Sequence, residues 1–223
     1  MEKVSILIGN YRKGRIMDIT LSSIYAQIYP SVEVMVLDSS NHPEDTAVLE
    51  RWKHKLDMKV FYQDRRKPLG WAYNFLLNRL SEDTEYVVFF SSDDYFGCKS
   101  RIERQVHYLE THPEVDFCYT GYHVYRDGEY LRTVQPPEER DFKYDSTSII
   151  TMMWRYSSIA GLGFSTQQYG EDLSFVHDAL TMGLIPGKCS DCLDIRWMIW
   201  STNSKLLRGK EAGKWAGKDS QDC

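Results

Sequence analysis

The stretch from Tyr86 to Phe96, YVVFFSSDDYF, starts as an apolar and aromatic run and ends near the adjacent acids Asp93 and Asp94. Such a run is typical of a central parallel strand, because helices cover a strand of this kind on both faces. Ligands of open α/β sheets bind outside the carboxyl ends of the strands, where these two acids would lie. Paired carboxylates there indicate a site for a divalent cation with a phosphate behind it.

Strand-like and helix-like stretches alternate ahead of this run. In chain order they cover residues 4–8, 17–28, 33–37, 43–56, 58–62, 70–80 and 86–90. Alternation of this kind predicts an α/β fold with a mostly parallel central sheet flanked by helices. The connections between parallel strands are expected to be right-handed crossovers.

Beyond residue 90 the sequence pattern predicts the secondary structure less directly. We expect a helix from about Lys99 to Glu110, a strand from Val115 to Thr120, and a hairpin around Arg126-Asp127-Gly128. The pattern breaks near Gln135. Later elements are expected as helices near Ser146–Trp154 and Glu171–Met182 and as a strand at Leu193–Trp200.

Composition excludes some classes of protein. The net charge of -5 argues against a nucleic-acid-binding protein, which needs a cationic surface. No run of 18 apolar residues predicts a transmembrane helix, and the strand starting at Val4 leaves no room for a signal peptide. Five cysteines without framework spacing suit reduced thiols. We therefore expect a cytoplasmic protein, either free or peripheral to a membrane.

Five stretches together resemble the inverting family 2 glycosyltransferases. They are VSILIGNY (4–11), VEVMVLDSS (32–40), PLGWAYN (68–74), FFSSDD (89–94) and GEDLSF (170–175). The first resembles the family's VSIIIPTY, the third its G-x-x-x-N element, and the fourth its D-x-D metal motif. The resemblance covers about residues 4 to 200, and its specificity lies in the order and spacing of the motifs.

The resemblance implies a GT-A fold and transfer of a sugar, with inversion, from a nucleotide-diphosphate donor to an acceptor hydroxyl. A UDP-sugar is the favoured donor, and Mn²⁺ or Mg²⁺ is the implied cofactor. On this basis we predict a nucleotide-sugar-binding part at residues 1–134, an acceptor-side part of the same domain at 135–204, and a polar tail at 205–223 that is expected to be disordered.

The implied metal ligands are Asp93 and Asp94, whose alternative role is a turn or helix cap. Asp93 aligns with the last acid of the D-x-D motif, and Ser92 is assigned to the nucleotide site. Ser91 stands where the family usually has the first acid. One negative charge is therefore lost, and weaker metal affinity is expected.

Four further residues are implied in nucleotide binding. Asp38 would accept a hydrogen bond from the base, and Asn10 and Tyr11 would flank the same base. Their alternatives are an Asx-turn and strand-end packing. Arg66 lies just before a predicted helix N-terminus, a place that favours phosphate, although a basic loop is often only solvated.

The last assignments concern the helix at 70–80 and the E-D pair. Asn74 is a candidate for a polar contact with the donor, or else a buried helix amide. Asp172 is the preferred general base for the acceptor hydroxyl, with Glu171 as second choice. Both acids also suit a helix N-terminus electrostatically.

Two other functions remain open. A nucleotide-sugar-binding module without turnover would explain Ser91 and the absence of a histidine from the segment 196–204, where some family members carry a metal-binding histidine. A sugar-phosphate nucleotidyltransferase ranks lower, because the loop after the first strand has only Gly9 and Gly14. A zinc site at Cys189 and Cys192 is disfavoured, since no second pair accompanies them.

Overall fold

The computed structural model describes residues 1–166, 170–190 and 195–199. The predicted tail at 205–223, Cys192 and Trp200 lie outside the described residues.

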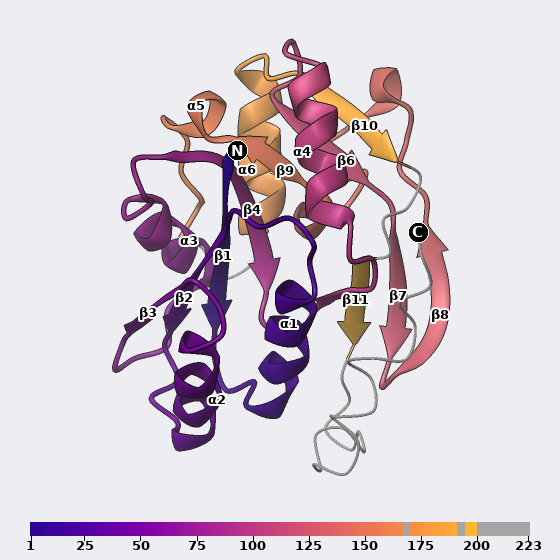
Figure 1. Cartoon of the computed structure of the whole chain (residues 1–223). Coiled ribbons are helices and arrows are strands. Elements are labelled where there is room, and N and C mark those ends of the chain that lie inside the picture. The colour runs from indigo at the N-terminus through magenta and orange to yellow at the C-terminus, as the bar shows by residue number, and fades with distance from the viewer. Residues whose placement is uncertain (167–169, 191–194, 200–223) are drawn as a thin grey trace.

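The prediction of a mostly parallel α/β fold is confirmed. A seven-stranded sheet has the order β10-β6-β9-β4-β1-β2-β3 (Figure 1). Its strands are β1 (Lys3–Asn10), β2 (Val32–Asp38), β3 (Met58–Tyr62), β4 (Thr84–Ser91), β6 (Phe117–Thr120), β9 (Met153–Arg155) and β10 (Pro186–Ser190). Only β9 runs antiparallel to its neighbours in this sheet, β4 and β6.

Helices cover both faces of this sheet. They are α1 (Arg15–Tyr25), α2 (Pro43–Lys53), α3 (Leu69–Leu77), α4 (Arg101–Thr111), α5 (Tyr156–Ile159) and α6 (Glu171–Thr181). In Figure 1, α1, α2 and α4 lie in front of the sheet, and α3 and α6 lie behind it. The apolar run of residues 86–90 in β4 is buried by this arrangement, as a central strand requires.

A second, four-stranded sheet has the order β5-β11-β7-β8. It consists of β5 (Tyr95–Phe96), β11 (Ile195–Ile199), β7 (Tyr122–Arg126) and β8 (Glu129–Val134). The predicted hairpin is confirmed, because β7 and β8 pair antiparallel around Asp127 and Gly128. Both turn residues have positive φ, 50° and 92°, as the tight hairpin turn demands.

The helix predicted near Ser146–Trp154 was wrong. That segment forms a 3₁₀ turn, η2 (Ile149–Thr151), and then enters the main sheet as β9. Three consecutive β-branched residues in η2 disfavour an α-helix. Trp154 is fully buried and stacks on Phe117 of β6, with ring centroids 4.1 Å apart. This packing can form only when residue 154 lies in the sheet.

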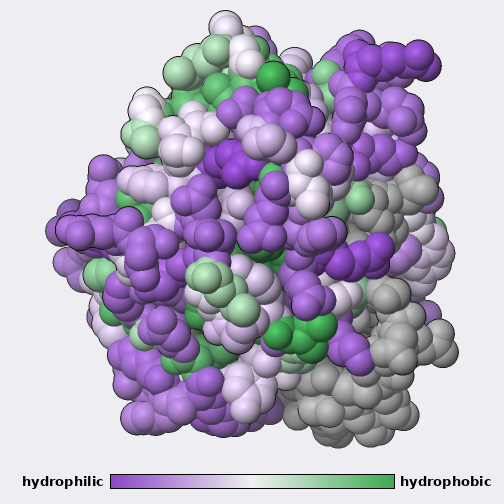
Figure 2. Space-filling view, turned by 45° about the horizontal axis from the view of Figure 1, so that its top comes forward, coloured by the Kyte–Doolittle hydropathy of each residue, from purple (hydrophilic) through white to green (hydrophobic). Residues whose placement is uncertain are grey.

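Four further elements were not predicted, namely β5, α5, β10 and the 3₁₀ turn η1. Strand β10 begins with Pro186 at the sheet edge, where a missing N–H costs no ladder hydrogen bond. A second 3₁₀ turn, η1 (Glu139–Asp141), lies in the segment that breaks the pattern. On the face shown in Figure 2, hydrophilic residues cover most of the surface and hydrophobic groups interrupt them.

Candidate active site

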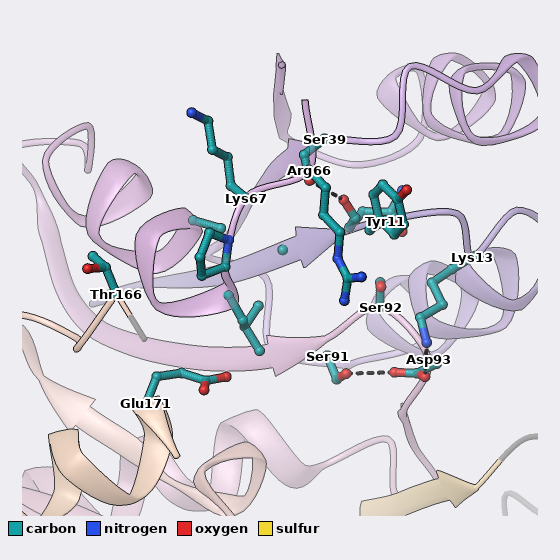
Figure 3. Close-up of a pocket in the computed structure, with 15 residues that line it drawn as sticks. Tyr11, Lys13, Ser39, Arg66, Lys67, Ser91, Ser92, Asp93, Thr166 and Glu171 are labelled. Atoms are coloured by element: carbon teal, nitrogen blue, oxygen red, sulfur yellow. Dashed lines mark hydrogen bonds and ion pairs between the residues drawn. The ribbon is translucent and has the colours of Figure 1, made fainter. Parts of the chain in front are cut away.

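An open cavity of about 620 Å³ lies at the carboxyl ends of β1, β2 and β4 (Figure 3). Register pairing places Asn10 beside Asp38, and Gly9 beside Ser91. The described lining residues are Gly9, Asn10, Tyr11, Lys13, Ser39, Arg66, Lys67, Pro68, Leu69, Ala72, Ser91, Ser92, Asp93, Thr166 and Glu171. The cavity is therefore at the edge of the sheet where open α/β folds bind ligands.

Asp93 lines the cavity just beyond the end of β4. Its Oδ1 accepts a hydrogen bond from Ser91 Oγ at 2.6 Å, and its Oδ2 forms an ion pair with Lys13. Ser92, which is 2% exposed, also lines the cavity. Ser91, which departs from the family motif, thus acts directly on the carboxylate predicted to hold a metal.

Asp94 lies deeper than Asp93. It is 2% exposed and is not among the described residues that line the cavity. Its carbonyl oxygen accepts a hydrogen bond from Thr20 Oγ1 at 2.6 Å, which ties α1 to the loop after β4. The structure therefore gives the two adjacent acids different environments.

Asn10 and Asp38 form one buried pair. Asn10 Nδ2 donates to Asp38 Oδ1 at 2.9 Å. Asp38 Oδ2 and Asn10 Oδ1 are buried and have no hydrogen-bond partner within the described part of the chain. Buried polar atoms without partners are rare and usually have a ligand or water. Asn10 lines the cavity, whereas Asp38 is fully buried and is not among the described lining residues.

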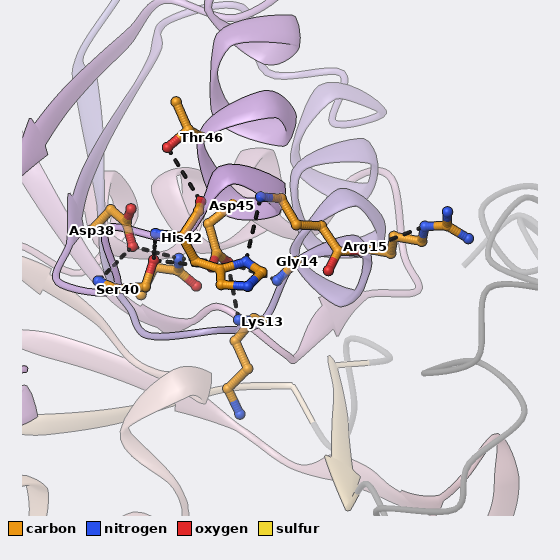
Figure 4. A network of polar contacts seen from close by, with 10 residues as sticks. Lys13, Gly14, Arg15, Asp38, Ser40, His42, Asp45 and Thr46 are labelled. Carbon is orange, nitrogen blue, oxygen red and sulfur yellow. Dashed lines mark hydrogen bonds and ion pairs between the residues drawn. The ribbon is translucent and has the colours of Figure 1, made fainter.

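Asp45, in the first turn of α2, organises the same region and was not predicted from the sequence. Its buried carboxylate accepts hydrogen bonds from Asn10 Nδ2 (3.1 Å), Lys13 N (3.0 Å), Gly14 N (2.7 Å) and Ser40 Oγ (2.9 Å) (Figure 4). It joins the loops that follow β1 and β2. Its only sequence signal is an acid just after Pro43 at a helix start.

Replacing Asp45 by Ala is expected to lower the free energy of unfolding by about 3 kcal/mol, because the loop N–H groups lose a charged acceptor. Urea denaturation measures this change. The neighbouring Glu44→Ala serves as the control, since the Glu44 side chain is 51% exposed. Equal stabilities of the two variants would contradict an organising role for Asp45.

Tyr11 and Arg66 lie together on another wall of the cavity. The Arg66 guanidinium lies over the Tyr11 ring, 4.9 Å from its centroid. In Figure 3 the Arg66 side chain extends into the cavity toward Ser92 and Lys13, whereas Lys67 points away from them. Arg66 is therefore well placed to meet an anionic ligand from the side opposite Asp93.

The E-D pair begins α6 at the far end of the cavity. Glu171 lines the cavity, and Asp172 is not among the described lining residues. Burial raises the pKa of Glu171 above its ordinary value, and the neighbouring Asp172 adds to this shift. Asp172 Oδ1 accepts a hydrogen bond from Leu173 N at 2.9 Å.

The four acids predicted at the metal and base positions lie near enough to the buried Tyr73 hydroxyl to affect its pKa. Burial raises the pKa of Tyr73 well above its usual value, and four carboxylates add to the shift: Asp172, Asp94, Glu171 and Asp93. Tyr73 therefore stays neutral. The fold thus brings acids that are about 80 residues apart in sequence to the same region.

Asn74 has a structural role in this fold. Its Nδ2 donates to Phe164 O at 2.9 Å, and its Oδ1 accepts from Phe164 N at 2.7 Å. Asn74 is absent from the described lining of the cavity. Both ends of the amide are used to hold the segment that leads to the E-D pair, so the geometry offers no support for the predicted donor contact.

Gly70 allows α3 to lie close to the same segment. A Cβ atom at Gly70 would overlap the Ser165 carbonyl oxygen and lie 3.1 Å from Glu171 Cβ. Gly70→Ala is expected to destabilise the fold by about 1–3 kcal/mol, the usual range for overpacking. Thermal unfolding measures it. Gly161→Ala is the control, because nothing lies within 4 Å of that Cβ position. Equal melting temperatures would contradict the close approach.

The described residues fit the implied divalent cation in one arrangement, with a carboxylate on one side of the cation and phosphates of the ligand on the other. Among residues 1–166, 170–190 and 195–199, no group of three or more His, Cys, Asp or Glu forms a cluster that could hold a metal. Mg²⁺ usually binds one or two carboxylates together with phosphates of the substrate. Asp93 suits that arrangement, in which the ligand's phosphates complete the coordination.

Comparisons with solved structures define the fold class. The chain resembles S. aureus TarS 1–349 in complex with UDP-GlcNAc, with a TM-score of 0.75 and 19% identity over 91% of this chain and 60% of that one. It also resembles the mannosyltransferase PcManGT from Pyrobaculum calidifontis in complex with GDP-Man and Mn²⁺, with a TM-score of 0.69 and 18% identity over 92% of this chain and 59% of that one. The fold is GT-A.

Comparison at the sequence level then gives the family. The model for glycosyl transferase family 2 matches residues 5–166, so this chain belongs to that family. One relative, WfaP of Escherichia coli, is a UDP-Glc:alpha-D-GlcNAc-diphosphoundecaprenol beta-1,3-glucosyltransferase. It is 25% identical over 170 residues, which are 74% of this chain and 65% of WfaP. The chain thus spans less than two thirds of that relative. No helix in the described part has the length and apolar character needed to span a membrane.

Proposed function

We propose that this chain transfers a sugar from a UDP-sugar to an acceptor hydroxyl, with inversion and with help from a divalent cation. The observation that carries the proposal is the single cavity lined by Asn10, Arg66, Asp93 and Glu171 at the carboxyl edge of the sheet. The bound UDP-GlcNAc of TarS and the GDP-Man and Mn²⁺ of PcManGT support this ligand class.

The nucleotide is proposed to lie along the β1 and β2 side of the cavity. The partnerless Asp38 Oδ2 supports its role as acceptor for a base N–H. Asn10 and Tyr11 would flank the base, and Ser92 would lie at the inner end of the nucleotide. Arg66, above Tyr11, would contact a phosphate.

The diphosphate is proposed to lie near Asp93. When a divalent cation is bound, Asp93 would hold it, with Asp94 behind, and its charge would stabilise the leaving diphosphate. Ser91 Oγ orients the Asp93 carboxylate by its hydrogen bond. Of the two described carboxylates in the lining, Asp93 and Glu171, only Asp93 follows β4, which is consistent with the expected weak metal affinity of the protein alone.

Asp172 is proposed as the general base that takes the acceptor's proton, and Glu171 remains the second candidate. Glu171 faces the donor cavity, and Asp172 follows it about 100° further around α6. The acceptor hydroxyl attacks the anomeric carbon from the side opposite the leaving diphosphate, so the base that takes its proton must lie on that side. The position of Asp172 outside the described donor lining favours Asp172, whereas the raised pKa of Glu171, caused first by burial, favours Glu171.

A binding module without turnover is the second candidate function. Ser91 in place of an acid and the Lys13–Asp93 ion pair are the observations that favour it. A nucleotidyltransferase has less support, because Asp45 holds the loop after β1 through two backbone N–H groups, leaving those donors unavailable to a triphosphate.

The first test is a thermal-shift screen of UDP- and GDP-sugars with and without Mn²⁺, followed by assay of free nucleotide release. The proposal expects stabilisation by a UDP-sugar and release of UDP when an acceptor is present. Stabilisation without release for any acceptor class would favour the binding module. No shift with any nucleotide sugar would contradict the donor site.

The place of action is also a proposal. We infer that the chain works in the cytoplasm, at the membrane surface when its acceptor is lipid-linked. The diphosphoundecaprenol acceptor in the name of WfaP supports a lipid-linked acceptor. Fractionation of cells expressing the chain tests this inference, with recovery only outside the cytoplasm as the contradicting result.

A further inference from the structure

Lys13 is a cation of the cavity that the sequence motifs did not single out. It comes from the loop between β1 and α1, and its ammonium forms an ion pair with Asp93 Oδ2, 80 residues away (Figure 3). The side chains of Lys13 and Asp93 are 35% and 18% exposed. The contact is therefore open to an incoming ligand but is not a fully solvated surface pair.

Asp45 holds the backbone at Lys13 in place. Asp45 Oδ1 accepts hydrogen bonds from the backbone N–H groups of Lys13 and Gly14, and Asp45 itself is fully buried. Arg12, just before, has a φ of 52°, a conformation that non-glycine residues rarely adopt. A loop keeps such a backbone conformation only when the surrounding contacts hold it there. The position of Lys13 in the cavity is therefore fixed by the fold.

The ion pair also satisfies the Asp93 carboxylate without a metal. One oxygen accepts from Ser91 Oγ at 2.6 Å and the other faces the Lys13 ammonium. A divalent cation that binds Asp93 must compete with this ammonium for the same oxygen. An ammonium displaced from there remains in the cavity, where it can meet a diphosphate as a charged donor.

We propose that Lys13 is the built-in cation of this site. It neutralises Asp93 when no divalent cation is bound, and it binds the donor diphosphate when the cation occupies Asp93. The proposal rests on the donor site of the proposed function. It adds that Lys13 binds the donor diphosphate and that Lys13 competes with the divalent cation for Asp93. Arg66 reaches the cavity from the opposite wall, so the two cations would hold the diphosphate between them.

Lys13→Met should change two affinities in opposite directions. Mn²⁺ alone should bind about 3- to 10-fold more tightly, because Asp93 no longer has a competing cation at short range. UDP with saturating Mn²⁺ should bind about 10-fold more weakly, because a charge-assisted hydrogen bond to phosphate is lost. UMP, which lacks the second phosphate, should lose less affinity than UDP.

The experiment is isothermal titration of the full chain with Mn²⁺ alone, and then with UDP and UMP at saturating Mn²⁺. Lys13→Arg keeps the charge and should restore UDP affinity to within about threefold, or about 0.7 kcal/mol. Arg15→Met is the matched control. It removes a cation two residues further along, at the first residue of α1. The Arg15 side chain is 57% exposed, pairs with Glu44 at 3.5 Å and is not among the described residues that line this cavity.

The outcomes separate this proposal from the one on which it rests. Wild-type chain that binds no UDP would overturn both. Wild-type chain that binds UDP while Lys13→Met binds it within about twofold would overturn only the role of Lys13. An unchanged Mn²⁺ affinity in Lys13→Met would contradict the proposed competition between Lys13 and Mn²⁺ for Asp93. Circular dichroism spectra that match the wild type show that each variant is folded.

Discussion

Replacing Asp172 by Asn is expected to lower the rate of sugar transfer by about 10²- to 10⁴-fold, the usual contribution of a general base. The substitution keeps the shape of the side chain at the start of α6 and removes its capacity to accept a proton. UDP affinity should stay within about threefold of the wild type, because Asp172 does not line the donor cavity. Initial-rate assays and UDP titration measure the two effects.

Glu171→Gln is the comparison that decides between the adjacent acids. If Asp172 is the base, Glu171→Gln should lower the rate less and should also weaken donor binding, because Glu171 lines the cavity. A larger fall in kcat for Glu171→Gln than for Asp172→Asn would exchange the two roles. Full activity in both variants would remove the E-D pair from the mechanism.

Replacing Asp93 by Asn is expected to abolish the gain in UDP affinity that Mn²⁺ produces. Loss of this carboxylate should weaken Mn²⁺-dependent UDP binding by about 10- to 100-fold, and transfer should fall at least as far. The amide oxygen of the variant is expected to keep the hydrogen bond that Asp93 Oδ1 accepts from Ser91 Oγ. Titration of UDP in Mn²⁺ and in EDTA isolates the metal-dependent part.

Asp178→Asn provides the matched control for Asp93. Its side chain is 53% exposed on α6 and lies 3.5 Å from His177 Nδ1, away from the cavity lining. This variant should keep the Mn²⁺ effect unchanged. An Asp93→Asn variant with an undiminished Mn²⁺ effect would show that the metal, if used, is held elsewhere.

Much of the first half of the fold could be predicted from the sequence, because its signals are local. Buried parallel strands need continuous apolar runs, and the run in β4 and the shorter runs in β1 and β2 have this property. The segment 146–154 could not be predicted in this way. Its strand exists because the main sheet has a place for Trp154 between β4 and β6, and no local pattern shows that place.

The candidate site divides in a similar way. Asp93 and Glu171 follow or begin elements that the pattern identifies, and both line the cavity. Lys13 and Asp45 carry no motif, and their roles depend on contacts between separate loops. Asn74 is a different case, because the amide at this motif position is bonded to the Phe164 backbone and the sequence alone does not show that contact.

By itself, the sequence determined that the apolar run at 86–90 is a buried strand, followed by acids at the binding edge of a parallel sheet. Its apolar run allows no solvated face. Only the tertiary structure decided what surrounds those acids. The distance from Lys13 to Asp93 and the burial of Asp94 depend on how α1, α2 and β4 pack together. Electrostatic interactions act through space, so their partners appear only when the chain is folded.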